Sequence, residues 1–319
     1  ERLISKKGYS RLNKRPMAEY QAQEAFYDLN NKNPLISFFR KINSALPFDG
    51  NQVAVYTDGY AMLQALMHEI GQAKHHIHLQ FYIFEDDSVG RLLRDLLIDK
   101  AREGVKVRLL YDDVGCWKVN PLFYDEMMCE GIEVQSFLKV RFPRFTSKVN
   151  YRNHRKIAII DGKVGFIGGM NIAERYLRGF SWGIWRDTHV CVKGKAVYGL
   201  QTAFLTDWFV VDRMLLTSSE YFPKMEWQGN VVAQIVTSEP VGDWHDIMQG
   251  LIKALCSSKR YFYIETPYLL PTEEVVVALQ TASLSGVDVR VMLPKRADTY
   301  LTHKGSLSYL DELMRAGVK

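Results

Sequence analysis

The segment NHRKIAIIDGKVGFIGGMNIAERY, residues 153–176, decides how the rest of the chain is interpreted. Its β-branched residues predict strands at 156–161 and 164–167, with a hairpin at Asp161-Gly162, a dipeptide typical of tight β-turns. Side chains alternate between the faces of a strand, so His154 and Lys156 are expected on one face, about 6–7 Å apart along the backbone. A glycine pair at 168–169 is expected to let backbone approach a ligand and to bring Asn171 back toward His154.

These residue types fit the exchange of phosphodiester bonds. A neutral imidazole such as His154 can attack phosphorus and form a covalent phosphohistidine. Lys156 and the amide of Asn171 are expected to stabilise the negative charge on the phosphoryl oxygens. A second group, usually another histidine, must protonate the leaving alkoxide. The HxKxxxxD pattern alone has a chance probability of a few per cent, and the spaced GG and N lower it by about four orders of magnitude.

The surrounding chain alternates helices with strands and predicts an α/β fold. Asp58 can cap a helix that carries apolar residues on one face. Strands at 77–83 and 105–111 flank a helix at 89–103 that ends before Gly104. Parallel strands joined by helices imply mixed, mostly parallel sheets flanked by helices.

The order of elements then begins a second time. AKHHIHLQFYIF at 73–84 aligns with SKRYFYIETPYL at 258–269, and GVKVRLLYDD at 104–113 aligns with GVDVRVMLPK at 286–295. The kept order of elements indicates a duplicated half. AGVK at 316–319 takes the place of EGIE at 130–133, so a second copy of the motif is expected roughly twenty residues past Lys319, by the spacing of the first copy.

Composition sets broad limits on the class of protein. The chain has 319 residues, 47% hydrophobic and 24% charged, with a formal net charge of +5, values typical of globular proteins and compatible with a phosphate-bearing partner. No stretch of 18 apolar residues occurs, which predicts no transmembrane helix. The basic residues of the first fifteen positions suit either a solvated tail or a juxtamembrane segment. The four cysteines, Cys116, Cys129, Cys191 and Cys256, lack zinc-like spacing and are expected to be reduced, buried thiols.

The motif at 153–176 resembles the HKD motif of the phospholipase D superfamily. WRDTHV at 185–190 and ETPYLLPTEE at 265–274 are similar to the cardiolipin synthase branch of that superfamily. The resemblance implies two α/β halves with an active site at their pseudo-twofold interface, here with the second half incomplete. It divides the chain into a basic, juxtamembrane-type leader at 1–45, a first half with the motif at 46–225, and a truncated second half at 226–319.

The resemblance also implies roles for individual residues. His154 and Lys156 carry the chemistry with Asn171, and Asp187 is expected to bind the other ring nitrogen of His154. Asp161 belongs to the motif, but an Asp before Gly is ordinary turn chemistry. The implied reaction needs neither metal nor cofactor. His189 is expected to be a satisfied core histidine, and the cluster of histidines at 75–78 lacks the acids or cysteines of a metal site.

The implied activity transfers a phosphatidyl group between two phosphatidylglycerol molecules, giving cardiolipin and glycerol. Its partners would be anionic phospholipid and a membrane surface, with no nucleic acid, on the cytoplasmic side of a bacterial inner membrane. The acid-free stretch 138–160, which alternates cations with aromatic residues, suits a cationic rim for lipid headgroups or a solvated basic loop. A phosphodiesterase or nuclease of the same superfamily, and a membrane-binding module without activity, are the alternatives.

Overall fold

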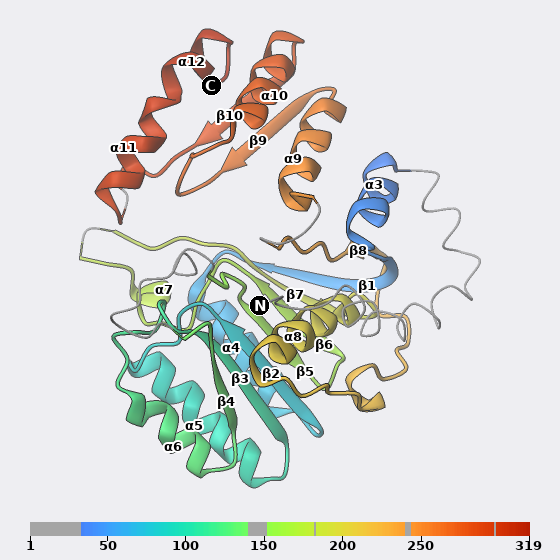
Figure 1. Ribbon diagram of the computed structural model, residues 1–319, viewed down its shortest axis with the longest axis vertical. Helices are drawn as coiled ribbons and strands as arrows, with labels where there is room; N and C mark the ends of the chain where they lie inside the picture. The colour runs from blue at the N-terminus through green and yellow to red at the C-terminus, as the bar shows by residue number, and fades with distance from the viewer. Residues whose placement is uncertain (1–32, 140–151, 182, 240–243, 297) are drawn as a thin grey trace. The chain divides into compact units, whose positions relative to one another are not determined.

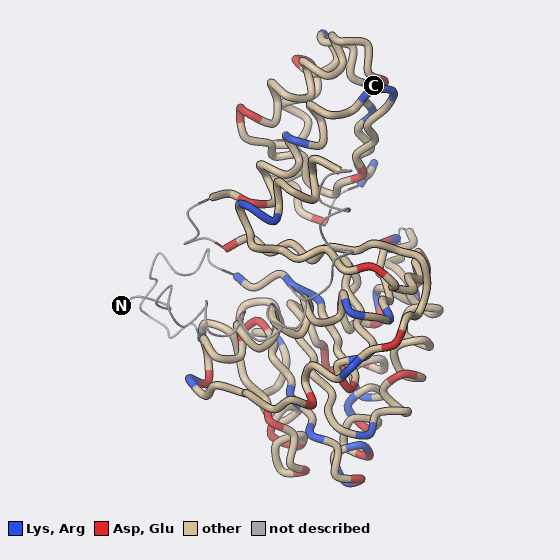
Figure 2. Tube along the Cα trace, turned by 90° about the vertical axis from the view of Figure 1, so that its right-hand side faces the viewer, with Lys and Arg blue, Asp and Glu red and all other residues tan. Residues whose placement is uncertain are grey.

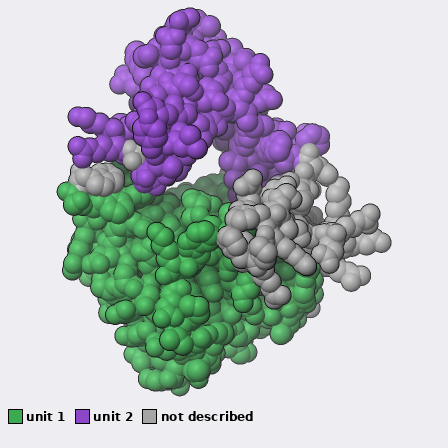
Figure 3. All heavy atoms as spheres, turned by 60° about the vertical axis from the view of Figure 1, so that its left-hand side comes forward, with its two compact units in different colours: residues 1–27, 46–235 green, residues 28–45, 236–319 purple. Residues whose placement is uncertain are grey.

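The computed structural model describes residues 33–139, 152–181, 183–239, 244–296 and 298–319. It separates into two compact units, which Figure 3 colours separately. Of the described residues, one unit holds 46–235 and the other holds 33–45 together with 236–319. Residues 33–45, which the sequence analysis assigns to the leader, are therefore grouped with the later part of the chain.

The larger unit is built on one eight-stranded sheet, with the order β4-β3-β2-β5-β6-β7-β1-β8 (Figure 1). Strand β1 lies in the stretch assigned to the first half, but no strand was predicted there. Strand β8 lies in the stretch 226–319 assigned to the second half, and it pairs with β1 in this sheet. The strands are β1 Pro47–Tyr56, β2 His76–Phe81, β3 Lys106–Asp112, β4 Glu133–Phe137, β5 Ile157–Ile160, β6 Val164–Gly168, β7 His189–Lys193 and β8 Val231–Gln234.

The sheet is mixed, as predicted, and its parallel pairs lie at one edge, whereas the remaining pairs are antiparallel. Strands β2, β3 and β4 are parallel neighbours. The other pairs in this sheet, from β2–β5 across to β1–β8, are antiparallel. The physical reason is connection length, because the tight turn between β5 and β6 cannot accommodate the crossover that parallel strands need. Asp161 and Gly162 both have positive φ, 52° and 65°, as the two central residues of a type I′ turn require.

Helices cover both faces of this sheet. Apolar side chains of α4, α5, α6 and α7 pack on one face, and those of α8 pack on the other. Asp58 caps α4 as predicted, since its Oδ1 accepts a hydrogen bond from the Ala61 N–H at 2.9 Å. A short 3₁₀ helix spans Ser219–Tyr221. The α-helices are α4 Gly59–Gly71, α5 Ser88–Arg102, α6 Pro121–Cys129, α7 Arg175–Arg178 and α8 Val197–Asp212.

The smaller unit has its own apolar core, around a parallel pair of strands. Helices α9 and α10 pack against each other, and α3 packs against α9. Asn43 at the end of α3 donates hydrogen bonds to the Thr237 carbonyl and to the Asp246 carboxylate. The elements are α3 Pro34–Asn43, α9 Asp246–Ser257, β9 Tyr261–Glu265, α10 Glu273–Leu284, β10 Asp288–Met292, α11 Tyr300–Ser308 and α12 Leu310–Arg315.

The pairing of strands supports the internal repeat. In each unit a parallel strand pair is joined by one crossover helix, β2-α5-β3 in the first and β9-α10-β10 in the second. Lys319 exchanges backbone hydrogen bonds with Val289 and Val291, which places it beside Arg290. In the first unit Glu133 lies beside Arg108 in the same way. The sequence alignment of 130–133 with 316–319 therefore agrees with the backbone register.

Three further observations concern composition. Basic and acidic residues are interspersed along the larger unit (Figure 2). All four cysteines are free thiols, as predicted, but only Cys116 and Cys191 are buried, whereas Cys129 and Cys256 are exposed. Among the described residues, no helix combines the length and hydropathy that a membrane span requires.

Candidate active site

His154 and Lys156 lie at the start of β5, beside the carboxyl end of β2, because these two strands are antiparallel. Their side chains meet on one face of the sheet. The Lys156 Nζ lies 2.9 Å from the His154 Nδ1 and donates a hydrogen bond to the His154 carbonyl oxygen at 2.7 Å. Lys156 is 3% exposed, whereas His154 is open to solvent. A ligand can therefore reach the imidazole from solvent, whereas the ammonium lies buried and bonds to the His154 carbonyl oxygen.

The charge states of the pair follow from burial. Burial, and then the charge of Lys156, lower the pKa of His154 to about 4. Burial also lowers the pKa of Lys156 to about 8, although the carboxylates of Asp187 and Asp112 act in the opposite direction. At neutral pH the imidazole is neutral and the ammonium is mostly charged. This is the combination that a nucleophile and a phosphate-binding cation require.

Tyr82, which the sequence analysis did not identify, completes the immediate surroundings of the pair. It directly follows β2, and its ring centroid lies 4.5 Å from that of His154. The Lys156 Nζ lies 5.2 Å from the centre of the same ring. An aromatic face beside an ammonium is favourable, so Tyr82 helps to fix both motif side chains. Its position at the end of a strand next to the motif strand was the available signal.

The glycine pair makes room for side chains of the β7 region. A Cβ at Gly169 would lie 1.9 Å from Asp187 Oδ1, and a Cβ at Gly168 would lie 2.5 Å from the His189 Cα. These glycines were expected to let backbone approach a ligand, but the space that they leave is occupied by protein. The carboxylate of Asp187 accepts a hydrogen bond from the Thr188 N–H at 2.7 Å. At the His154 Nδ1, where Asp187 was expected, the structure places Lys156.

Asn171 does not present its amide to the phosphate site. Its Oδ1 accepts a hydrogen bond from the Ile83 N–H at 2.9 Å, and its Nδ2 donates to the Tyr176 hydroxyl at 2.6 Å. The residue is 4% exposed. The expectation that this amide is a free donor to phosphoryl oxygens therefore differs from the structure, because both ends of the side chain join the β2 region to α7.

Asp161 lies at the opposite end of β5 from His154. Its carboxylate accepts hydrogen bonds from the N–H groups of Lys74, His75 and His76, at 2.8–2.9 Å. Burial acts to raise the pKa of this carboxyl, but these N–H donors outweigh it and hold the pKa below its usual value. The motif aspartate thus holds the start of β2 against the β5–β6 turn and does not contact His154 or Lys156.

Two buried aspartates that the sequence analysis missed fix the segment before His154. Asp112, at the end of β3, accepts a hydrogen bond from the Asn153 N–H at 3.0 Å. Asp207, on α8, accepts hydrogen bonds from the amides of Asn153 and Gln80 at 2.7 and 2.6 Å, and also pairs with Arg155. Their partners lie 41–127 residues away in sequence, so no local pattern could have identified them.

His189 lies on β7 directly opposite Gly168. It is fully buried, as predicted for a core histidine, but both of its ring nitrogens lack a hydrogen-bond partner among the described residues. Burial, and then the nearby charge of Lys156, lower its pKa to about 4. The ring is therefore a neutral polar group behind the reacting lysine, and not the satisfied core histidine that was expected.

The other histidines contribute to packing. His76 and His78 face α8, where both bond with Gln201 and His78 stacks on Phe204. His75 is exposed, with its Nδ1 3.9 Å from a Glu220 carboxylate oxygen. Among the described residues no three histidines, cysteines or acids gather as metal ligands would.

The expected cationic rim falls largely on residues 140–151, outside the described residues. Two arginines that follow them are engaged within the protein. Arg152 donates a hydrogen bond to the Leu138 carbonyl at 3.0 Å and lies 3.6 Å from the Asp112 carboxylate. Arg155 pairs with Asp207. These two cations hold the motif segment in place, so they do not form an open rim for headgroups.

Comparison with known proteins gives a consistent result. Residues 66–208 and 251–319 match the family model described as "Cardiolipin synthase, PLD-like domain". The chain is 39% identical to a cardiolipin synthase of Geobacillus kaustophilus, over 90% of this chain and 58% of that protein. It is also 39% identical to the major cardiolipin synthase of Bacillus subtilis, over 97% of this chain and 66% of that protein. The chain thus spans about three-fifths of the length of these relatives.

A solved structure shares the fold at low sequence identity. Phosphatidylserine synthase from Haemophilus influenzae aligns with a TM-score of 0.59 and 14% identity, over 89% of this chain and 73% of that one. At this identity the likeness concerns the fold alone. It agrees with the α/β architecture expected from the sequence.

Proposed function

Because the chain belongs to the family described as cardiolipin synthase, PLD-like domain, we propose that it carries one part of a phosphatidyltransferase site. The reaction joins two phosphatidylglycerol molecules into cardiolipin and releases glycerol. The observation that carries the proposal is the neutral imidazole of His154 in contact with the ammonium of Lys156 at the solvent-facing end of β5. The names of the relatives support the choice of lipid substrate.

The mechanism has two displacements at phosphorus. In the first, a ring nitrogen of His154, or of a counterpart histidine, forms a bond to phosphorus. The bond from phosphorus to the headgroup oxygen breaks, and a second acid protonates the departing glycerol. In the second, a hydroxyl of another phosphatidylglycerol loses its proton to that group and attacks phosphorus. The phosphorus–nitrogen bond breaks, and the histidine is regenerated.

Lys156 links substrate binding to the tautomer of His154. An ammonium is only a donor, so its contact with Nδ1 requires the imidazole proton to sit on Nε2. Attack through Nε2 needs the opposite tautomer. A bound phosphate draws the ammonium to its own oxygens, and Asp187 then accepts the Nδ1 proton in a hydrogen bond. Asp161 and Asn171 act indirectly, by holding the strands that carry the pair.

We further propose a membrane setting, the cytoplasmic face of a bacterial inner membrane, with anionic phospholipid as the partner. The support is chemical, because both substrates are lipids whose headgroups must reach the exposed imidazole at a membrane surface. The family resemblance supports the same setting.

The test uses the intact protein and vesicles that contain phosphatidylglycerol labelled in the phosphatidyl group. Formation of labelled cardiolipin, release of glycerol and an acid-labile phosphohistidine are expected. His154→Ala should abolish all three, whereas His75→Ala, which changes an exposed histidine outside the site, should leave them intact. Acid-soluble nucleotides released from DNA, with no lipid product, would favour the nuclease alternative. Unchanged lipid transfer by His154→Ala would refute the proposal.

A further inference from the structure

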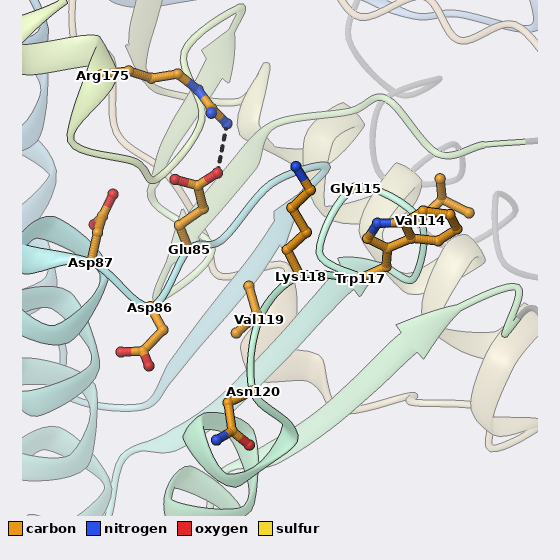
Figure 4. Close-up of a pocket in the computed structure, with 10 residues that line it drawn as sticks. All are labelled: Glu85, Asp86, Asp87, Val114, Gly115, Trp117, Lys118, Val119, Asn120 and Arg175. Atoms are coloured by element: carbon orange, nitrogen blue, oxygen red, sulfur yellow. Dashed lines mark ion pairs between the residues drawn. The ribbon is translucent and has the colours of Figure 1, made fainter.

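A cavity of about 470 Å³ opens at the carboxyl ends of the parallel strands β2 and β3. Its lining comes from residues 85–87 after β2, residues 114–115 and 117–120 after β3, and Arg175 on α7 (Figure 4). The volume lies within the roughly 300–1,000 Å³ range of small-molecule sites. Ligands of open α/β sheets also bind outside the carboxyl ends of parallel strands.

The cavity adjoins the reacting histidine through one residue. A Cβ on Gly115, in the cavity wall, would lie 2.1 Å from the Tyr82 carbonyl oxygen, so the wall packs directly on Tyr82. The ring of Tyr82 in turn contacts that of His154. Tyr82 therefore lies between the cavity wall and the His154 ring, and a headgroup whose phosphate lies at His154 would reach this cavity past Tyr82.

Most charges in the lining are already paired. Glu85 pairs with Arg175 at 2.9 Å, and Figure 4 shows this pair at one side of the cavity. Asp86 pairs with Arg91 at 2.6 Å. Asp87 accepts three backbone N–H groups, those of Val89 and Gly90 at the start of α5 and that of Glu174.

Lys118 differs from the other charged groups of the lining. It is exposed and has no ion pair among the described residues. In Figure 4 its side chain extends toward the space beside the Glu85 carboxylate. The cavity therefore offers both a donor, the ammonium of Lys118, and acceptors, the remaining lone pairs of the Glu85 carboxylate.

This combination discriminates between classes of headgroup. A second phosphate accepts hydrogen bonds only and would meet three carboxylates. An ammonium headgroup donates only, so it could bond to Glu85 but would leave Lys118 without an acceptor and beside a like charge. A hydroxyl both donates and accepts, so two neighbouring hydroxyls can satisfy Glu85 and Lys118 together without adding charge.

We propose that this cavity binds the hydroxylated headgroup, the glycerol moiety that leaves in the first displacement and attacks in the second. The assignment rests on the proposed phosphatidyl transfer. Glu85 accepts a hydrogen bond from one hydroxyl, Lys118 donates to a neighbouring hydroxyl oxygen, and Arg175 holds Glu85 in place. The cavity selects a vicinal diol over a simple alcohol or an amine.

The test separates this selection from catalysis. The intact enzyme receives phosphatidyl-p-nitrophenol as donor, whose leaving group needs no hydroxyl recognition, with glycerol, ethanol and ethanolamine as competing acceptors. Nitrophenol release reports the first displacement, and the phosphatidylglycerol to phosphatidylethanol ratio reports acceptor choice. Glu85→Gln and Lys118→Met should each lower that ratio about tenfold or more, with nitrophenol release unchanged. Glu126→Gln, which removes a surface acid paired with Arg94 outside the cavity, should alter neither.

The outcomes distinguish the two proposals. Nitrophenol release that does not depend on His154 would refute phosphatidyl transfer itself. Histidine-dependent release with an unchanged acceptor ratio in both cavity variants would refute the cavity assignment alone. Preference of the unaltered enzyme for ethanolamine over glycerol would overturn the choice of a hydroxylated headgroup.

Discussion

Replacing Gly169 by alanine should disturb the site through one carboxylate. The added Cβ would lie 1.9 Å from Asp187 Oδ1, where ordinary contact begins at 3.4 Å. The carboxylate must therefore retreat by roughly 1.5 Å, or the strand must shift, at a cost of about 1–3 kcal/mol in the free energy of unfolding. The φ of Gly169 is not positive, so steric overlap alone causes the effect.

The same substitution should also change the pKa of Lys156, and through it the pH dependence of activity. Asp187 raises the pKa of this lysine against the larger effect of burial, which lowers it to about 8. At an effective dielectric constant of about 20, a charge pair loses roughly 1 kcal/mol when its separation grows from about 4 to about 5.5 Å. That loss corresponds to roughly 0.7 pH unit. The ammonium that binds phosphate is lost as pH rises through its pKa, so Gly169→Ala should move the alkaline fall in activity to lower pH.

The assay is the pH profile of phosphatidyl transfer by the intact enzyme between pH 6 and about 10, the range that brackets the usual lysine pKa. The unaltered protein should lose activity with a midpoint near 8. Gly169→Ala should lower that midpoint by roughly half to one unit. Gly71→Ala is the control, because a Cβ there meets nothing within 4 Å. An unmoved midpoint in Gly169→Ala, with activity reduced equally at every pH, would refute the electrostatic part of this reasoning.

Two further predictions concern stability. Asp207→Ala removes the acceptor that Arg155 and the amides of Asn153 and Gln80 share. It should lower the free energy of unfolding, measured by urea titration, by about 3–5 kcal/mol. A loss under about 1 kcal/mol would contradict the anchoring role. The pKa of His189 is about 4 when folded, against an ordinary histidine value of 6.5, so the unfolded state binds more protons and stability should fall as pH drops through this range. His189→Leu should weaken that dependence in urea titrations at pH 7 and about 4.5, and identical slopes in both proteins would argue against a buried neutral imidazole.

Local signals in the sequence were sufficient for much of the fold. The Asp161-Gly162 turn, the Asp58 helix cap and the strand-helix alternation follow from nearest neighbours in the chain. The spacing of His154 and Lys156 placed them on one face, because alternation along a strand is fixed by backbone geometry. Strand β1 was missed because its polar and glycine residues, PFDGNQVAVY, hide the usual alternation.

Pairing across long sequence separations was not available from the sequence. The roles of Asn171 and the glycine pair were misjudged, because the space beside them is filled by Tyr176, Asp187 and His189 from other elements. The parallel or antiparallel direction of the strands likewise depends on which neighbours meet in the sheet. Tyr82 could be recognised only once β2 and β5 were known to be adjacent.

The sequence by itself determined the candidate pair: an imidazole and an ammonium two residues apart, in a chain whose α/β order repeats. Which side chains share a face of a strand depends only on their spacing along the chain, so it can be predicted without knowledge of the fold. Only the tertiary structure decided which aspartates hold the motif segment and what lies at the His154 Nδ1. These depend on contacts between residues far apart in the chain, whose partners are chosen by packing and by the hydrogen-bond requirements of buried polar groups.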